Sequence, residues 1–218
     1  MTTSMTERVA AFEAKAAAEF PADALAVFGG ERVFQGAKCP LDVPAPGTPM
    51  PDGELLDAHG NPTTLAAARA GKPAVVVFYR GAWCPYCNLT LRAYQEDLLA
   101  ELTARGVGLV AISPQKPDGA LSAQETNQLS YAVLSDPGNQ IAGALGILTE
   151  TGEAAVAVAA QLGLVVADTN ADGTAAIPMP TVVMLDAAGA IQWIDVHPDY
   201  GTRTEPTEIL KHVADLTG

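Results

Sequence analysis

An unbroken run of six apolar residues, Ala74 to Tyr79, constrains the fold more than any other feature of the chain. The run has the length of a strand and is rich in β-branched and aromatic side chains. It predicts a strand that is buried on both faces, as in the middle of a sheet covered by helices on either side. Residues 107–112 form a second run of this kind, and residues 131–134 form a shorter one.

Helical patterns separate these expected strands. Leu91, Tyr94, Leu98 and Leu102 share one face of a helix expected at 87–104. We expect a short hairpin within 54–65 that leads into a helix, and further helices at about 117–129, 138–147 and 152–162. A loop follows the last of these helices. The chain then continues with a hairpin of 181–185 with 190–194 and a final helix from Pro206. This alternation indicates an α/β sandwich with a central mixed sheet flanked by helices.

The first part of the chain has a different character. Apolar residues from Val9 to Phe20 fall at helical spacing and Pro21 interrupts the pattern, so residues 5–28 predict one or two helices. Residues 29–51 are rich in glycine and proline and predict a connector. We therefore expect an N-terminal helical extension and connector at 1–43, followed by the α/β domain at 44–218.

The charge balance and the sparse cysteines narrow the partners and the compartment. With 25 acidic against 12 basic residues, the formal net charge is −13, which argues against a nucleic acid or an anionic membrane as partner. No apolar stretch approaches the ~18 residues of a membrane span, and charges interrupt the start of the chain where a signal peptide would need an apolar core. Three cysteines, two of them close together, fit a reducing compartment, so the cytoplasm is expected.

The close pair lies in the run Trp83-Cys84-Pro85-Tyr86-Cys87, between the buried strand and the helix that follows it. Such a junction places Cys84 at a helix N-terminus, where backbone N–H groups and the helix dipole stabilise a thiolate. We expect Cys84 to be the exposed nucleophile with the lower pKa, and Cys87 to be the shielded cysteine that closes a disulfide with it. Pro85 stiffens this small ring. A zinc site would need two further ligands, and two buried structural cysteines are the other alternative.

The run from Phe78 to Asn88 resembles the peroxiredoxin-like branch of the thioredoxin superfamily, related to alkyl hydroperoxide reductase and thiol-specific antioxidant proteins. The resemblance covers about residues 44–215 and implies a thioredoxin-like sandwich. Met179-Pro180-Thr181 is similar to the loop in which the superfamily carries a cis-proline that faces the cysteines, so the resemblance implies a cis bond before Pro180 and places Thr181 beside the site. The runs 186–189 and 197–206 also resemble the C-terminal end of the branch.

Three positions depart from the pattern of this branch. When Cys87 is aligned with the peroxide-reactive cysteine, the usual proline and the usual threonine or serine before it become Arg80 and Cys84. The activating arginine of the family falls on Pro180. We therefore expect weakened hydroperoxide reduction beside intact dithiol–disulfide exchange, and this register leaves Cys87 as the alternative first nucleophile.

The resemblance implies a peroxiredoxin-like antioxidant enzyme. A thiolate of the Cys84/Cys87 pair attacks a hydroperoxide to give a sulfenic acid, the partner cysteine condenses with it, and an external dithiol, from a thioredoxin or glutathione system, reduces the disulfide. The alternative is a thioredoxin-like oxidoreductase that acts on disulfides without significant peroxidase activity, and a non-catalytic redox sensor is a third. No cofactor is expected, and a homodimer is left open.

Several other side chains carry two interpretations each. Arg80 is either a cation that stabilises the thiolate or a strand-end charge that reaches solvent or a carboxylate. Trp83 and Tyr86 either form a contact surface around the sulfurs or pack inside the fold. Cys39 is either a second resolving cysteine or an incidental thiol. Turn chemistry accounts for His59.

Overall fold

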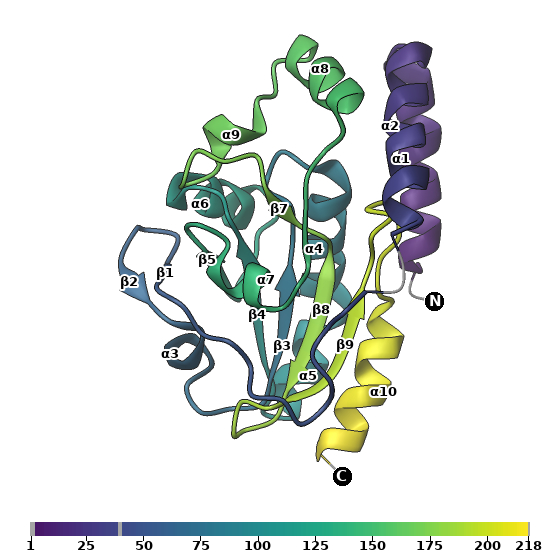
Figure 1. The fold of residues 1–218 in the computed structure, drawn as a ribbon. Coiled ribbons are helices and arrows are strands. Elements are labelled where there is room, and N and C mark those ends of the chain that lie inside the picture. Colours follow the sequence, from purple (N-terminus) through teal and green to yellow (C-terminus); the bar gives the residue numbers. More distant parts are fainter. Residues whose placement is uncertain (1–2, 39–40, 218) are drawn as a thin grey trace.

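A computed structural model describes residues 3–38 and 41–217 of the chain. Within these residues, a seven-stranded mixed sheet has the order β2-β1-β5-β4-β3-β8-β9 (Figure 1). The strands β3, β4 and β5 are parallel, whereas β8 pairs with β3, and β9 with β8, in antiparallel fashion. The strands of this sheet are β1 (Leu55–Leu56), β2 (Pro62–Thr63), β3 (Ala74–Phe78), β4 (Gly108–Ser113), β5 (Ala132–Ser135), β8 (Thr181–Leu185) and β9 (Ile191–Val196).

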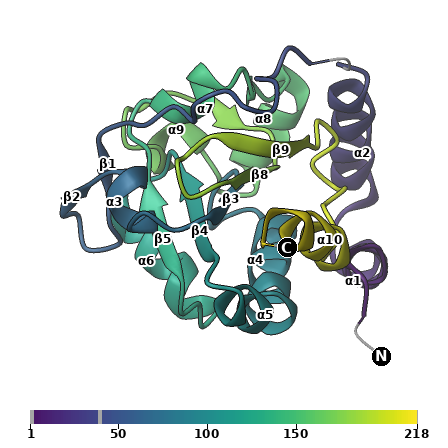
Figure 2. The ribbon, with the colours of Figure 1, turned by 90° about the horizontal axis from the view of Figure 1, so that it is seen from below.

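Helices cover both faces of the sheet, as the apolar run of β3 requires. Val75 and Val77 point into one apolar cluster and Val76 and Phe78 into another on the opposite face, because successive side chains of a strand alternate. In Figure 2, α4, α5 and α10 lie on one side of β8 and β9, and α7 lies on the other. The helices behind these layers are α3 (Leu65–Arg69), α4 (Pro85–Asp97), α5 (Leu99–Ala104), α6 (Pro117–Thr126), α7 (Gln140–Ala144) and α10 (Pro206–Thr217). The expected α/β sandwich is confirmed.

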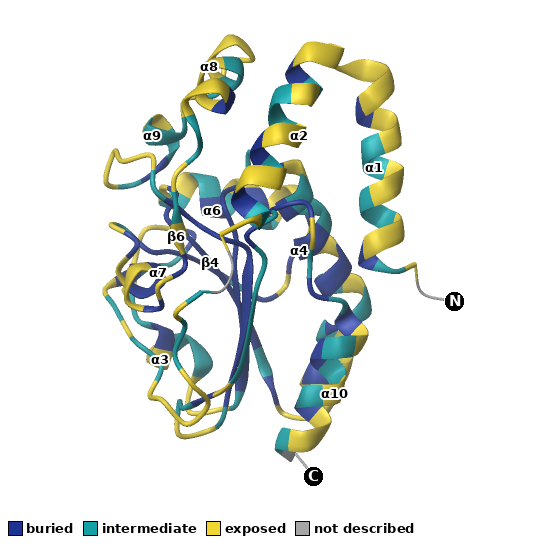
Figure 3. Cartoon of the chain, turned by 45° about the vertical axis from the view of Figure 1, so that its right-hand side comes forward, coloured by how far each residue is buried: buried dark blue, intermediate teal, exposed yellow. Residues whose placement is uncertain are grey.

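The N-terminal extension is a pair of helices, α1 (Met5–Glu19), which contacts α4, and α2 (Ala22–Gly36), which contacts the later helix α8 (Glu153–Gln161). Figure 3 shows exposed residues along the outer faces of both helices. The connector predicted from residue 29 is wrong for its first eight residues, because α2 continues to Gly36. Buried Glu31 and Gln35 bond to the chain at Gly152 and Glu150, and these tertiary contacts outweigh the low helix propensity of Gly29 and Gly30.

Two further expectations need correction. The helix predicted at 87–104 begins earlier, at Pro85, and is divided at Leu98 into α4 and α5. The stretch that the sequence left as a loop after residue 162 contains a short helix, α9 (Val166–Thr169), and a strand, β7 (Ile177–Pro178), that pairs with β6 (Leu148–Thr149). The preceding helix α8 (Glu153–Gln161) is confirmed and packs against α2.

No helix in the described part of the chain combines the length and the apolar character needed to cross a membrane.

Candidate active site

The cysteine pair lies where β3 passes into α4. Cys84 is the N-cap residue of α4, Pro85 occupies its exposed first turn, and Cys87 follows within that turn. The backbone N–H of Cys87 and that of Asn88 both donate to the carbonyl of Cys84, at 3.1 Å each. The strand-to-helix junction predicted from the sequence is therefore confirmed, and proline is well suited to this position because a first-turn N–H has no helical acceptor.

Two amide side chains fix the loop before Cys84. The N–H of Ala82 donates to Gln115 Oε1 at 2.7 Å, and Asn88 Nδ2 donates to the carbonyl of Ala82 at 2.6 Å. Buried Gln115 also donates to the Tyr79 hydroxyl at 3.1 Å, so it joins the loop to the end of β3. Gly81 has φ +152°, and a Cβ there would collide with the indole of Trp83. These bonds tie the loop to Gln115 and to Asn88 of α4.

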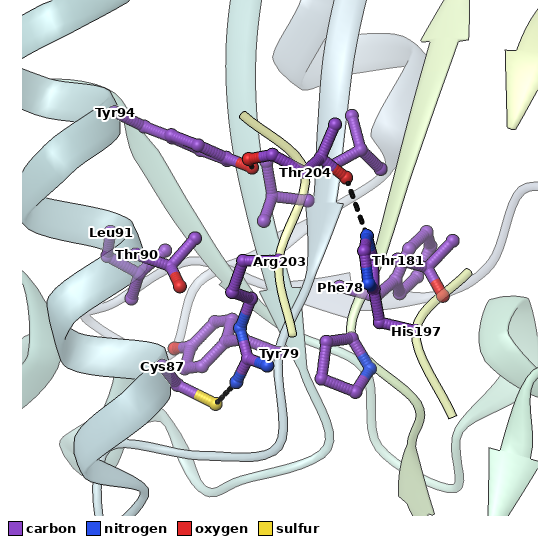
Figure 4. A pocket seen from close by; sticks show the side chains of 13 residues that line it. Phe78, Tyr79, Cys87, Thr90, Leu91, Tyr94, Thr181, His197, Arg203 and Thr204 are labelled. Carbon is purple, nitrogen blue, oxygen red and sulfur yellow. Dashed lines mark hydrogen bonds between the residues drawn. The ribbon is translucent and has the colours of Figure 1, made fainter. Parts of the chain in front are cut away.

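Both cysteines are free thiols with 1% of their surface exposed. Arg203, in the segment between β9 and α10, places Nη2 3.6 Å from the Sγ of Cys87 (Figure 4). Its other terminal nitrogen donates to the carbonyls of Tyr200 and Thr202, which hold the guanidinium in this orientation. A cation that the sequence did not indicate therefore lies directly against Cys87.

A second guanidinium approaches from the end of β3. Arg80 is 7% exposed and lies over the rings of Tyr200 and Trp83, at 3.9 and 5.0 Å from their centroids. No carboxylate lies within ion-pair distance of it among the residues that the structure describes. The interpretation of Arg80 as a solvent-exposed or carboxylate-paired charge is therefore wrong, and its positive charge acts on both thiols.

The two thiols differ sharply in acidity. Burial raises the pKa of Cys87, but the hydrogen bond from Cys84, the charges of Arg203 and Arg80 and the backbone N–H of Arg80 outweigh it and lower that pKa to about 5. Burial, and the bond and charge of Cys87, raise the pKa of Cys84 well above its ordinary value. The expectation that Cys84 has the lower pKa is thus wrong. That expectation rested on the N-terminus of the helix alone, whereas the charges of Arg203 and Arg80 favour the thiolate form of Cys87.

Tyr86, between the two cysteines, packs inside the fold. Its ring makes edge contacts with Phe12 of α1 at 5.0 Å and with Tyr200 at 6.0 Å, and its hydroxyl donates to Glu13 at 3.2 Å. These contacts favour the packing interpretation of Tyr86, and its part in a contact surface around the sulfurs stays a prediction. Trp83 is half-buried, and its indole N–H has no acceptor among the described residues.

A small cavity opens beside Cys87. Its free volume is about 10 Å³, roughly what one water-sized molecule requires. Pro180 and Thr181 line this cavity together with Cys87, Arg203 and His197 (Figure 4). The resemblance therefore placed Pro180 and Thr181 correctly next to Cys87, while the isomer of the Met179–Pro180 bond stays a prediction. The Thr181 hydroxyl itself donates to the carbonyl of Met179 at 2.8 Å.

Sequence reasoning missed Arg203 and Gln115. Arg203 is 116 residues from Cys87 and Gln115 is 33 from Ala82, so no local pattern joins them to the motif. The one available signal was that 197–206 resembles the end of a known family. Cys39 lies outside the described residues, and within those residues no group of three His, Cys, Asp or Glu side chains could hold a metal ion.

The model of the AhpC/TSA family matches residues 46–194. A Mycobacterium tuberculosis protein named "putative peroxiredoxin" is 33% identical over 105 residues, which are 48% of this chain and 66% of the relative, just under two thirds of its length. A Haemophilus influenzae protein named "putative peroxiredoxin bcp" is 32% identical over 111 residues, covering 51% of this chain and 68% of the relative.

Solved structures share the fold. Peroxidoxin BcpB of Mycobacterium tuberculosis superposes with a TM-score of 0.57 and 22% identity, over 78% of this chain and 95% of its own. Reduced Prx3 of Vibrio vulnificus, solved in complex with hydrogen peroxide, gives a TM-score of 0.62 and 18% identity, over 78% of this chain and 99% of its own. These similarities show a peroxiredoxin-type thioredoxin fold.

Proposed function

The chain belongs to the AhpC/TSA family, and from this premise we propose that it is a thiol peroxidase in which Cys87 reduces a hydroperoxide and Cys84 resolves the product. One observation carries the choice of Cys87: the guanidinium of Arg203 lies 3.6 Å from its sulfur. A nearby cation favours the thiolate, and the thiolate is the nucleophilic form of cysteine.

In the first step, the Cys87 thiolate attacks one oxygen of the hydroperoxide. The S–O bond forms as the O–O bond breaks, Cys87 is oxidised to the sulfenic acid, and the other oxygen leaves as alkoxide or hydroxide and takes up a proton. Negative charge grows on the leaving oxygen, so donors aimed at it lower the barrier. Arg203 lines the cavity beside Cys87, and it supplies such donors.

In the second step, Cys84 attacks the sulfur of the sulfenic acid, the disulfide forms and water leaves. The two residues share one helical turn, so the condensation needs no distant segment to approach. An external dithiol then reduces the disulfide through a mixed disulfide and is itself oxidised. We propose a protein or small-molecule dithiol of the thioredoxin or glutathione type as this donor, and the cytoplasm as the compartment that supplies it.

The size of the cavity favours small hydroperoxides. Its free volume of about 10 Å³ suits hydrogen peroxide better than a long-chain hydroperoxide, which requires the pocket walls to move. We retain residues 44–218 as the proposed catalytic domain and 1–43 as its extension.

Consumption of hydrogen peroxide with dithiothreitol as donor tests this function. The wild type should turn over and Cys87→Ser should be inactive. Cys84→Ser should consume about one equivalent of hydrogen peroxide per chain in a first reaction, and its further, donor-dependent turnover should be slower than that of the wild type. If the wild type exchanges a small disulfide but consumes no peroxide, the alternative oxidoreductase function is correct.

A further inference from the structure

Arg32 of α2 is the residue through which the N-terminal helices reach the cysteine site. Its Nε donates to Asp199 Oδ1 at 2.7 Å and its Nη2 to Asp199 Oδ2 at 3.2 Å, so it binds both oxygens of that carboxylate. Its remaining nitrogen donates to Glu13 and to the Tyr86 hydroxyl. One guanidinium therefore joins α1, α2, the cysteine motif and the segment that carries Arg203.

Asp199 is the acidic neighbour of Arg203 on that segment. The positive charges of Arg32 and Arg203 both act on its carboxyl group, yet only Arg32 forms an ion pair with it in the described part of the chain. Arg203 instead bonds to two backbone carbonyls and to Cys87. A carboxylate with both oxygens occupied competes weakly for a second guanidinium, because a bidentate pair satisfies its strongest acceptor sites.

The segment is also built to receive Arg32. A Cβ on Gly201 would collide with the guanidinium of Arg32, and the N–H of Gly201 donates to Asp199 Oδ1 at 2.8 Å. At the other end of the segment, Tyr94 of α4 donates to the carbonyl of Thr204 at 2.8 Å. Arg203 thus lies between two anchors, and the one at Thr204 does not involve Arg32.

We infer that Arg32 is a positioning residue for the thiol chemistry: by occupying both oxygens of Asp199, it leaves Arg203 free to hold the Cys87 thiolate. The inference rests on the proposed function of Cys87 as the reacting cysteine. It makes the N-terminal extension a part of the active site, because without α2 the carboxylate would attract Arg203 away from the sulfur.

The pH dependence of Cys87 alkylation by iodoacetamide tests this in the full-length reduced chain, without any peroxide. The groups that act on the Cys87 thiol are Cys84, Arg203 and Arg80, and its charge also affects Tyr79. All four stay unchanged in the variants used. In Arg32→Gln the freed carboxylate draws Arg203 away, and we expect the pKa of Cys87 to rise by about one unit or more.

The decisive variant is the double substitution Arg32→Gln with Asp199→Asn. Asparagine keeps the acceptor for the Gly201 N–H but carries no charge, so Arg203 has no competing partner and the pKa should return close to the wild-type value. Arg8→Gln is the matched control, because Arg8 also ties α1 to the body of the protein, through Glu96 at 2.9 Å and Asp97 at 2.6 Å. It should leave the pKa of Cys87 unchanged.

An unchanged pKa in Arg32→Gln, or a pKa that stays raised in the double variant, overturns the inference and makes Arg32 a packing residue. If Arg32→Gln does not fold, Gly201→Ala provides the same test. Its methyl group displaces the guanidinium of Arg32 from Asp199, while the negative charge of Asp199 remains, so the pKa of Cys87 should again rise. The proposed function fails separately, if the wild type shows the expected thiol titration but consumes no peroxide.

Discussion

Replacing Arg203 with glutamine perturbs the contact on which the proposed chemistry most depends. The guanidinium nitrogen lies 3.6 Å from the Cys87 sulfur, and two opposite unit charges at that separation attract by about 4–5 kcal/mol at an effective dielectric constant of about 20. Because Arg203 is only half-buried, solvent screens part of this attraction. We expect the pKa of Cys87 to rise from its value of about 5 by about 1–2 units, the usual effect of one close opposite charge.

The loss of peroxide reactivity should be much larger than the loss of thiolate. A rise of that size lowers the thiolate fraction near neutral pH by about two-fold at most, because the thiol still ionises at or below that pH. Losing a donor to the leaving oxygen should cost about 10²–10³ in rate. The second-order rate constant of Arg203→Gln should therefore stay about 10²-fold or more below that of the wild type, even at a pH at which Cys87 is fully ionised in both proteins.

Stopped-flow mixing of the reduced protein with hydrogen peroxide, followed by tryptophan fluorescence, measures this rate constant. The pH series runs from below the pKa of Cys87 to above that of a free thiol, and Arg105→Gln removes the same charge from an exposed site as a control. An unchanged midpoint in the dependence of the rate constant on pH would refute the attraction between Arg203 and the Cys87 thiolate. Equal rates at the high-pH plateau would refute its role at the leaving oxygen.

Other outcomes concern stability and the oxidised state. Because the pKa of Cys87 in the folded chain is about 5 and that of an unfolded cysteine is about 8.5, the unfolding free energy of the reduced wild type relative to Cys87→Ser should increase with pH between these values, and only the pH-independent effect of the substitution should remain below about pH 5. Urea titrations across this range check the direction, and a difference independent of pH would contradict it. Gln115→Ala should destabilise by about 1–3 kcal/mol, because the half-buried N–H of Ala82 and the buried hydroxyl of Tyr79 lose their partner. Gln161→Ala, at an exposed position, should change the stability little. Equal urea midpoints for the two variants would contradict the structural role of Gln115. Non-reduced digests of the peroxide-treated wild type should contain Cys84 and Cys87 in one linked peptide, whereas recovery of both as alkylated cysteines would exclude the disulfide.

The sequence predicted those parts of the fold that a local pattern determines. The run from Ala74 to Tyr79 required cover on both faces, and β3 has it. The helix after the cysteine pair followed from apolar spacing, although α4 begins two residues earlier than expected, at Pro85. The continuation of α2 through Gly29 and Gly30 could not be predicted, because it depends on contacts with residues more than a hundred positions further along the chain.

In the candidate site, too, some features could be predicted from the sequence and others could not. The cysteines could be placed from their own motif, because its spacing and its junction with a strand are local features, whereas Pro180 and Thr181 were placed by the resemblance of their loop to that of the superfamily. The acidity of the two thiols could not, because it depends on Arg203, which reaches the site from a segment distant in the sequence. Alignment of the family's arginine with Pro180 suggested that the activating cation was missing. A guanidinium from another part of the chain, that of Arg203, nevertheless lies against Cys87, while the weakened peroxide reduction expected from Pro180 stays a prediction.

Trapping the sulfenic acid after a single turnover tests the role of Cys87 most directly. Reduced Cys84→Ser is mixed with one equivalent of hydrogen peroxide in the presence of dimedone, and the modified residue is located by mass spectrometry, with Cys87→Ser treated in parallel. We predict a dimedone adduct on Cys87 in the first variant and no adduct on Cys84 in the second. An adduct on Cys84 in Cys87→Ser, formed as fast as the wild type reacts with peroxide, would contradict the assignment of Cys87 as the peroxide-reactive cysteine.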